Sequence, residues 1–313
     1  MSNYDLSFCT PADIPSEILE YDTPLEQLSV GISGKLGILQ LDLEKDKYNN
    51  KTSIKNQFYK VPLCIKRALY LEETCPEMAY VYIISPSGGI LQGDRYRTDI
   101  TLKKSAKSHI TTQSATRIYK MNKNFGTQII NLDIDENCYL EYIPDQIIPF
   151  KNSKYYQVSN IRVHDTATCI YSEILTPGRV ASGESFEYDV CYMKVKSVNH
   201  QNKIRFIDIA KLEPKKENIQ SFGIMNDYDI LGNVYVLLPK SYVTEIKNEI
   251  NSLLNNLNLN NVIGGCTKLP DDSGLLVRLL GQYVFDIKNI IYLIIGIIRK
   301  KILNISFSKM RKI

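Results

Sequence analysis

Residues 85–95, which read SPSGGILQGDR, constrain the fold of this chain more than any other stretch. An apolar run precedes the stretch, and a segment of alternating polar and apolar residues, 96–103, follows it. Three glycines and a proline within nine residues indicate a backbone path that residues with a Cβ atom would resist. The stretch ends in Asp94 and Arg95, at the start of the following strand. We therefore predict a tight connection between two strands.

Alternation of apolar and polar residues, the period of a β-strand, recurs from about residue 30 to residue 210. The clearest segments are 39–44, 96–103, 130–135 and 186–193. An Asn-rich turn at 199–202 then joins two strands as in a β-hairpin, whereas the Asn- and Lys-rich segment 48–57 predicts a loop. Because no long helical pattern lies between the strands, the sequence argues against a parallel α/β fold.

The pattern changes near residue 240. Residues 241–257 carry apolar side chains at helical spacing, with Ser241 as the expected N-cap. A strand is expected over 274–280 and a second helix over 282–302. At the other end, residues 1–30 hold three prolines and many acids, and predict an irregular N-terminal arm.

No internal repeat or proline-rich linker divides the chain, so we predict a single domain over residues 1–313. A chain of this length lies where single compact cores stop growing. A core can lengthen without thickening if sheets are stacked along one direction. The expected fold is therefore mainly β, a single elongated domain of stacked or helically arranged β-sheets with two α-helices near the C-terminus.

The composition excludes several classes of protein. The net charge is only +4, from 38 basic and 34 acidic residues that are scattered along the chain, which argues against a nucleic-acid partner. Seven cysteines, odd in number and never spaced as CxxC, fit a reducing cytosol better than a disulfide framework. The most apolar run, 290–298, is about half of the roughly 20 residues that a membrane span needs. We expect a soluble, cytoplasmic protein without a signal peptide or a membrane partner.

The glycine-rich stretch admits two interpretations. Backbone amides freed from side chains can hold a phosphate group. A true phosphate loop, however, has the pattern GxxxxGK[ST] and opens a helix, whereas here the last glycine precedes Asp94 and a strand. A structural turn or a partner surface is therefore the preferred interpretation.

Three further groups of polar residues each have a functional and an ordinary interpretation. The hydroxyl-rich segment 111–117 either lines a water-filled passage or an interface, or is a strand whose threonines hydrogen-bond sideways. Glu141 either passes a divalent ion along a polar path, or is a solvated charge at a strand edge or part of an ion pair. Arg179 either clamps a carboxylate of a partner or closes a turn.

The sequence shows no dedicated metal site and no catalytic motif. The three histidines, His109, His164 and His200, do not form HxH, HxxxH or HExxH patterns, and the cysteines do not cluster beside them. There is no GxSxG motif and no paired acids in a sugar-hydrolase context. We therefore expect no enzyme activity, and the residues of any metal site stay unknown.

The ordered motifs resemble the urease accessory proteins of the UreD or UreH family. The motifs are GG-x-x-x-GD at 88–94, TTQ at 111–113, LEYIP at 140–144 followed by IPF at 148–150, GR-x-x-x-GE at 178–184, and LLVRLLG at 275–281 before a helix that ends in a basic dipeptide. The resemblance extends from about Gly34 to Lys300. Ser114 and Arg117 depart from the family's usual alanine and lysine.

The resemblance implies a non-catalytic scaffold or chaperone for nickel insertion into urease. Such a protein binds apo-urease and the accessory protein UreF, which recruits the GTPase UreG. It has no cofactor of its own, although transient Ni²⁺ binding is compatible with the role. The alternative is a generic β-rich protein interaction module unrelated to nickel.

The site residues implied by the resemblance either bind partners or line a passage for nickel. These are Gly88, Gly89, Gly93, Asp94, Arg95, Thr111, Thr112, Gln113, Glu141 and Arg179.

Overall fold

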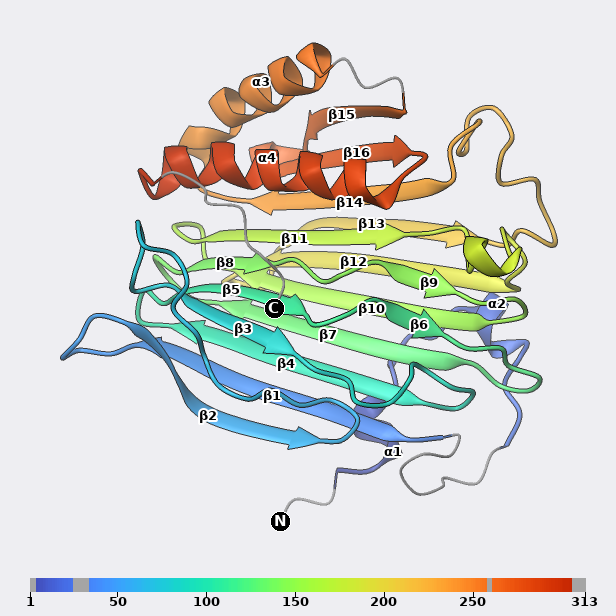
Figure 1. Ribbon diagram of the computed structural model, residues 1–313. Helices are drawn as coiled ribbons and strands as arrows, with labels where there is room; N and C mark the ends of the chain where they lie inside the picture. The colour runs from blue at the N-terminus through green and yellow to red at the C-terminus, as the bar shows by residue number, and fades with distance from the viewer. Residues whose placement is uncertain (1–3, 25–33, 258–260, 306–313) are drawn as a thin grey trace.

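The alternating segments of the sequence form two β-sheets, which lie against each other in the computed structural model (Figure 1). The structure describes residues 4–24, 34–257 and 261–305. Among these, the first sheet has the strand order β13-β12-β10-β7-β4-β1-β2. Its strands are β1 (Leu36–Lys45), β2 (Thr52–Lys60), β4 (Arg95–Lys103), β7 (Gly126–Ile134), β10 (Lys154–Val163), β12 (Val190–Asn199) and β13 (Ile204–Leu212).

The second sheet has the order β15-β16-β14-β11-β8-β5-β3, with the short strands β6 and β9 paired beside β11. Its strands are β3 (Ala79–Ile83), β5 (Lys107–Thr112), β6 (Thr116–Ile118), β8 (Tyr139–Tyr142), β9 (Ile147–Pro149), β11 (Thr168–Leu175), β14 (Ile230–Leu237), β15 (Val262–Lys268) and β16 (Leu275–Gly281).

Between β3 and β12 the chain winds as a β-solenoid. Successive long strands alternate between the two sheets, so that β4, β7, β10 and β12 lie side by side and parallel in the first sheet. Parallel neighbours need a long return connection, which is usually a helix. Here the strands of the second sheet provide that return. The prediction of an elongated, mainly β fold with helically arranged sheets is confirmed.

The first sheet ends in antiparallel strands on both sides. The expected hairpin at 199–202 is confirmed, because β13 pairs antiparallel with β12. At the other edge, β2 covers most of the segment 48–57 for which we expected a loop, and that prediction is wrong. Most side chains of this edge strand are exposed, so the strand has no apolar face that would produce an alternating pattern.

The expected strand over 186–193 is only half right, because β12 begins at Val190. Phe186 adopts a left-handed backbone conformation with φ 54°, which ends any extended segment there. Tyr188 is nevertheless fully buried, because this loop packs into the core. The apolar alternation before Val190 thus reflects burial of a loop.

The two C-terminal helices, α3 (Lys240–Asn256) and α4 (Val284–Ile302), are confirmed. Both pack on the second sheet, and the apolar run 290–298 supplies the buried face of α4. The N-cap of α3 is Pro239, so the prediction of Ser241 as the cap is wrong, because Ser241 already lies inside the first turn.

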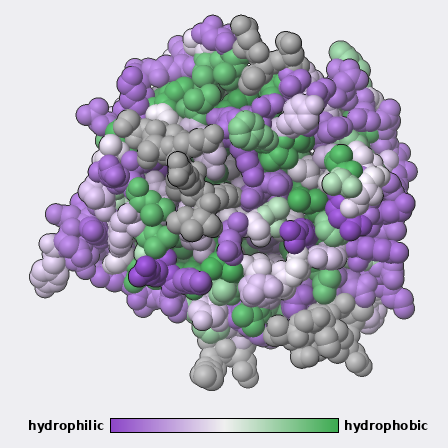
Figure 2. All heavy atoms as spheres, in the orientation of Figure 1, coloured by the Kyte–Doolittle hydropathy of each residue, from purple (hydrophilic) through white to green (hydrophobic). Residues whose placement is uncertain are grey.

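Figure 2 shows hydrophobic residues near the top of the visible face, in the region where α3 and α4 lie in Figure 1. Helix α4 exposes Phe285 and Leu293 to solvent. Within the described residues, no helix combines the length and the apolar character needed to cross a membrane.

The N-terminal segment contains two short helices, α1 (Leu6–Cys9) and α2 (Ser16–Leu19), so residues 1–30 are not irregular throughout. Residues 1–3 and 25–30 of the predicted arm lie outside the described residues. Ile18 is fully buried against Phe125 and Tyr156 on the outer face of the first sheet. The segment therefore covers part of that sheet.

Candidate functional site: a polar passage between the sheets

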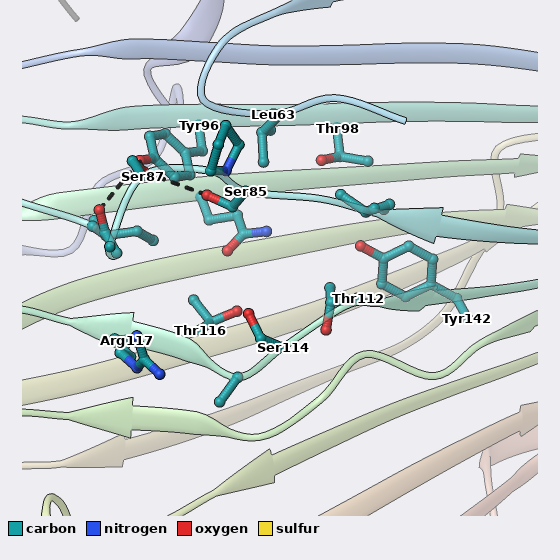
Figure 3. Close-up of a pocket in the computed structure, with 17 residues that line it drawn as sticks. Leu63, Ser85, Ser87, Tyr96, Thr98, Thr112, Ser114, Thr116, Arg117 and Tyr142 are labelled. Atoms are coloured by element: carbon teal, nitrogen blue, oxygen red, sulfur yellow. Dashed lines mark hydrogen bonds between the residues drawn. The ribbon is translucent and has the colours of Figure 1, made fainter. Parts of the chain in front are cut away.

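The connection from β3 to β4 carries the glycine-rich stretch, and a cavity of about 230 Å³ lies beside it. Ser85 and Ser87 line the cavity from this connection, and Thr112, Ser114 and Thr116 line it from the end of β5 and the start of β6. Figure 3 shows the hydroxyl groups of these two segments on either side of the cavity. The cavity is therefore polar and is formed by segments that are separate in the sequence.

Close backbone contact explains two of the glycines. A Cβ atom on Gly89 would lie 2.4 Å from the carbonyl oxygen of Arg117, and one on Gly88 would lie 2.8 Å from the hydroxyl of Tyr119. Gly93 has φ 73°, a left-handed conformation that glycine adopts without strain. The stretch therefore lies directly on β6 and shapes the edge of the cavity.

Asp94 and Arg95 are buried and anchor the glycine-rich stretch. The carboxylate of Asp94 accepts hydrogen bonds from Nζ of Lys35 at 2.6 Å and from the backbone N–H of Leu91 at 2.9 Å. The guanidinium of Arg95 donates to the carbonyl oxygen of Phe125 at 2.6 Å and lies over the ring of the same residue. Neither side chain is among those that line the cavity.

A narrower cavity of about 20 Å³ continues from the first one between the sheets. The two cavities share Thr112, Thr116, Gln128 and Tyr142, and the second one reaches Glu173. We refer to both cavities together as the passage. Its walls come from β4, β7 and β10 of the first sheet and from β3, β5, β6, β8, β9 and β11 of the second.

Glu173 is the buried carboxylate of the passage, with 3% of its surface exposed. Its Oε1 accepts hydrogen bonds from the hydroxyl of Tyr171 at 2.6 Å and from Nε2 of Gln157 at 2.7 Å. Burial raises the pKa of Glu173 to about 7. Across the part of the chain that the structure describes, Glu173 forms no ion pair within 4.0 Å. A carboxylate without a cation beside it can make weak contact with a divalent ion, and so can the oxygen of a neutral amide side chain.

Sequence reasoning missed the polar residues Gln128, Gln157 and Glu173. A signal was present for Glu173, because it is the one acid in an otherwise uncharged segment, TCIYSEIL, which forms β11. Every residue of that strand is buried. A carboxylate inside such a strand needs either partners or a function.

The three residues of the TTQ motif point in different directions. Thr112 lines the passage, and its hydroxyl accepts the N–H of Asp145 at 2.8 Å. Thr111 faces away, and its hydroxyl donates to the carbonyl oxygen of Ile143 at 2.7 Å. Gln113 is exposed at a different surface pocket. Successive residues of a strand face opposite sides, so this motif can bring only one of its threonines to the passage.

Glu141 lies on the face of β8 opposite to Tyr142 and the passage. Its carboxylate accepts hydrogen bonds from Nε of Arg299 at 2.7 Å, from the hydroxyl of Tyr139 at 2.7 Å, and contacts Nδ1 of His109 at 2.5 Å. Burial alone would raise the pKa of Glu141, but the bonds from Arg299 and His109 outweigh it and lower the pKa to about 2. Glu141 thus joins the second sheet to α4.

Arg179 lies in the loop after β11 and closes a turn. Its Nε donates to Oε2 of Glu184 at 2.9 Å, and its guanidinium lies 4.3 Å from the centre of the Phe150 ring. The side chain is 43% exposed, so it reaches the surface. Of the predicted site residues, the structure brings Gly88, Gly89 and Thr112 to the passage.

Comparison with known proteins then identifies the family. The sequence model of the UreD urease accessory protein matches residues 35–312. The chain belongs to the UreD family. It is 39% identical to the urease accessory protein UreD of Cenarchaeum symbiosum (strain A), over 91% of this chain and 99% of the relative. It is 37% identical to UreD 2 of Brucella suis biovar 1 (strain 1330), over 85% and 87%. It is 36% identical to UreD of Yersinia pseudotuberculosis serotype O:3 (strain YPIII), over 93% and 90%.

The matched part of this UreD chain contains both sheets, the passage and helices α3 and α4, whereas α1 and α2 precede it. This result favours the interpretation as a urease accessory protein over the alternative of a generic β-rich interaction module. The features at the passage are therefore to be interpreted in the context of urease maturation.

The histidines of this UreD chain are not grouped for metal binding. Within the described ranges, no three or more His, Cys, Asp or Glu side chains form a group that could hold a metal ion. The rings of His164 and His200 lie 4.5 Å apart, which the sequence did not reveal. Nδ1 of His164 contacts the hydroxyl of Thr166 at 2.9 Å and its backbone N–H at 3.2 Å.

Proposed function

We propose that this UreD chain is a non-catalytic, cytoplasmic scaffold for urease maturation. It binds apo-urease and UreF, and through UreF the GTPase UreG. The proposal is supported by membership of a family of urease accessory proteins and by relatives of that name at 36–39% identity. GTP hydrolysis takes place on the partner, and no reaction takes place at residues of this chain.

We further propose that Ni²⁺ is the cargo and moves through the passage. The observation that carries this proposal is the buried carboxyl group of Glu173, which is bonded by neutral groups and lines the narrow cavity between the two sheets. Hydroxyl and amide groups from both sheets supply oxygen atoms along the wall. Oxygen ligands hold Ni²⁺ less strongly than imidazole or thiolate, so an ion can leave as readily as it enters.

Co-expression tests the scaffold role. The tagged chain is expressed with UreF, UreG and the urease subunits from the same source, and the proteins that co-purify are identified and weighed. We expect a complex that contains UreF and UreG together with this chain. A soluble, folded chain that retains neither protein would contradict the scaffold proposal.

Narrowing the passage tests the nickel route. Thr116→Leu adds bulk to the wall shared by the two cavities, whereas Thr101→Leu adds the same bulk on the outer face of β4. We expect Thr116→Leu to lower the nickel content and activity of urease severalfold while the complex with UreF and UreG still forms. Thr101→Leu should leave the nickel content unchanged. Full nickel loading with Thr116→Leu would rule out this route.

A further inference from the structure

The two sheets do not end at the same place on the side of β13. Strand β13 is the outermost strand of the first sheet, and β14 and β16 of the second sheet lie over it. The hydroxyl of Tyr235 in β14 and the guanidinium of Arg278 in β16 both donate to Asp208 of β13, at 2.7 Å and 2.6 Å. Strand β15 lies on the far side of β16 (Figure 1). The second sheet therefore extends beyond the first by the width of β15.

Strand β15 has an uncovered inner face. Ile263 and Gly265 lie directly opposite Leu280 and Arg278 of β16, and opposite residues of neighbouring strands share a face. Because Arg278 reaches β13, this face is the one turned toward the first sheet. Ile263 is half-exposed, and a Cβ atom on Gly265 would have no neighbour within 4 Å among the described residues. We refer to this inner face of β15 as the β15 overhang.

An apolar cavity of about 470 Å³ lies at one end of the β15 overhang. Apart from Arg278 and two glycines, the residues that line it are apolar, namely Leu212, Ile224, Met225, Leu231, Ile263 and Leu280. Apolar surface that stays in contact with water is unfavourable and often marks a place where another chain packs. An element that fills this space should therefore be apolar on the side that faces the β15 overhang.

Strand β13 has an open edge and an apolar outer face. No described strand pairs with its outer edge. Phe206 points inward and stacks on Tyr235, so Ile207 and Ile209 point outward. Both isoleucines are half-exposed, and neither belongs to the core under the N-terminal segment. A long apolar strand at an open edge is prone to pair with a strand of another chain.

A strand fits the space beside β13 and beneath the β15 overhang. Neighbouring strands lie about 4.8 Å apart and facing sheets about 10 Å apart, so a strand paired with β13 would lie under β15 at the usual distance. Its side chains toward the overhang should be apolar. Ile207 and Ile209 on the outer face of β13 have this property. The chain thus carries both the uncovered surface and the side chains that can cover it.

Only one two-fold arrangement brings these surfaces together. An axis perpendicular to the first sheet pairs two β13 edges antiparallel, but it forces the overhanging strands of both copies into the same space. An axis within the sheet and perpendicular to β13 does not bring the two edges side by side. An axis parallel to β13 pairs the edges in parallel and turns the outer face of each β13 toward the β15 overhang of the other copy.

We infer that a second copy of this chain covers the β15 overhang. In the two-fold dimer, β13 pairs in parallel with β13 of the other copy, and each overhang covers Ile207 and Ile209 of the other copy. The interface is isologous, so both contacts form together and the open edge of β13 is closed. The inference depends neither on the proposed nickel route nor on the binding of UreF.

Sedimentation equilibrium of the full-length protein over a range of concentrations tests the inference. We expect a dimer that dissociates on dilution. Ile209→Lys places a charge where the dimer would desolvate it, and should raise the dissociation constant of the dimer at least about tenfold. The matched control is Tyr59→Lys, because Tyr59 is exposed to the same extent on β2, the outermost strand at the opposite edge of the same sheet. This control should dimerise like the unmodified protein.

Gly265→Lys tests the other half of the contact. The new side chain would enter the space that β13 of the other copy needs, whereas the open space around Gly265 leaves the single chain undisturbed. The variant should be folded by circular dichroism, and monomeric at concentrations where the unmodified protein is a dimer.

Three results would overturn the inference. The first is an unmodified protein that is monomeric at every concentration. The second is a dimer that Ile209→Lys and Gly265→Lys leave unchanged, or that Tyr59→Lys weakens equally. The third is a monomeric chain whose complex with UreF is lost in Ile209→Lys, which would assign the surface to a different protein.

Discussion

At the scale of single residues, Glu141 and Glu173 show how the surroundings of a buried carboxylate decide its charge. Both are almost completely buried. Glu141 contacts Arg299 and His109, which outweigh the effect of burial and lower its pKa to about 2. Glu173 is bonded only by neutral groups, so burial dominates and raises its pKa to about 7. The first carboxylate therefore joins α4 to the second sheet, whereas the second has no cation to offset its burial.

Removal of Arg299 should destabilise the protein strongly. Arg299→Ala leaves the carboxylates of Glu141 and Glu72 buried without their cation, which typically costs about 3–5 kcal/mol in the free energy of unfolding. Chemical denaturation measures the loss. The control is Arg162→Ala, because its ion pair with Asp133 is exposed and should contribute less than about 1 kcal/mol. Similar losses in both variants would contradict the structural role of Glu141.

Glu173 should make stability depend on pH in a defined direction. Its pKa is raised in the folded state, so its contribution is fully present below the unfolded pKa of 4.5 and is lost as the pH rises through about 7. Glu173→Gln removes this loss. The free energy of unfolding of the variant, minus that of the unmodified protein, should therefore increase by about 3 kcal/mol between pH 4 and pH 8. A difference that does not change with pH would show that Glu173 is not buried as described.

At the scale of elements, the sequence predicts strands where one face is buried and the other is exposed. This condition holds for β1, β4 and β7, whose alternation appears directly in the burial of their side chains. It fails for β2, which is exposed on most of its length, and for β11, which is buried throughout. Alternation reveals which face a residue occupies and not which residue lies opposite. The meeting of Gln128 and Glu173 in one passage therefore could not be predicted.

The glycine-rich connection should tolerate no side chain at residue 89. Gly89→Ala would place a Cβ atom 2.4 Å from the carbonyl oxygen of Arg117, which forces the backbone of β6 or of the connection to move. Overpacking of this kind typically costs about 1–3 kcal/mol, and thermal or chemical unfolding measures it. Gly265→Ala is the control, because a Cβ atom there has no neighbour within 4 Å. An unchanged stability of Gly89→Ala would mean that the connection does not lie against β6.

At the scale of the whole molecule, three hydrophobic cores hold together the N-terminal segment, the two sheets and the C-terminal helices. The interior between the sheets is the main core, the second core lies under α3 and α4, and a smaller one lies under the N-terminal segment. Chain length and the absence of linkers were sufficient to expect an elongated stack of sheets. Which strands pair in each coil of the chain was not predictable, because the coils share no repeated sequence motif from which a common unit could be recognised.

The N-terminal segment should contribute to stability through Ile18. Ile18→Ala removes a fully buried side chain from the core on the outer face of the first sheet, and should lower the free energy of unfolding by about 2–5 kcal/mol. Its neighbour Leu19 is 46% exposed, so Leu19→Ala should change stability by no more than about 0.5 kcal/mol. Denaturation of both variants tests whether the segment is docked. Equal, small effects would show that it is not.

The passage is enclosed by two hydrogen-bonded sheets whose inner surfaces face each other across it. Facing sheets keep a spacing of about 10 Å, and a wider separation would require the packed core to come apart. The bore can therefore change only by rotation of the side chains that line it. On the proposed nickel route, an ion would travel through a rigid conduit, and backbone amides of β7, β10 and β11 would stay protected from hydrogen exchange during its passage.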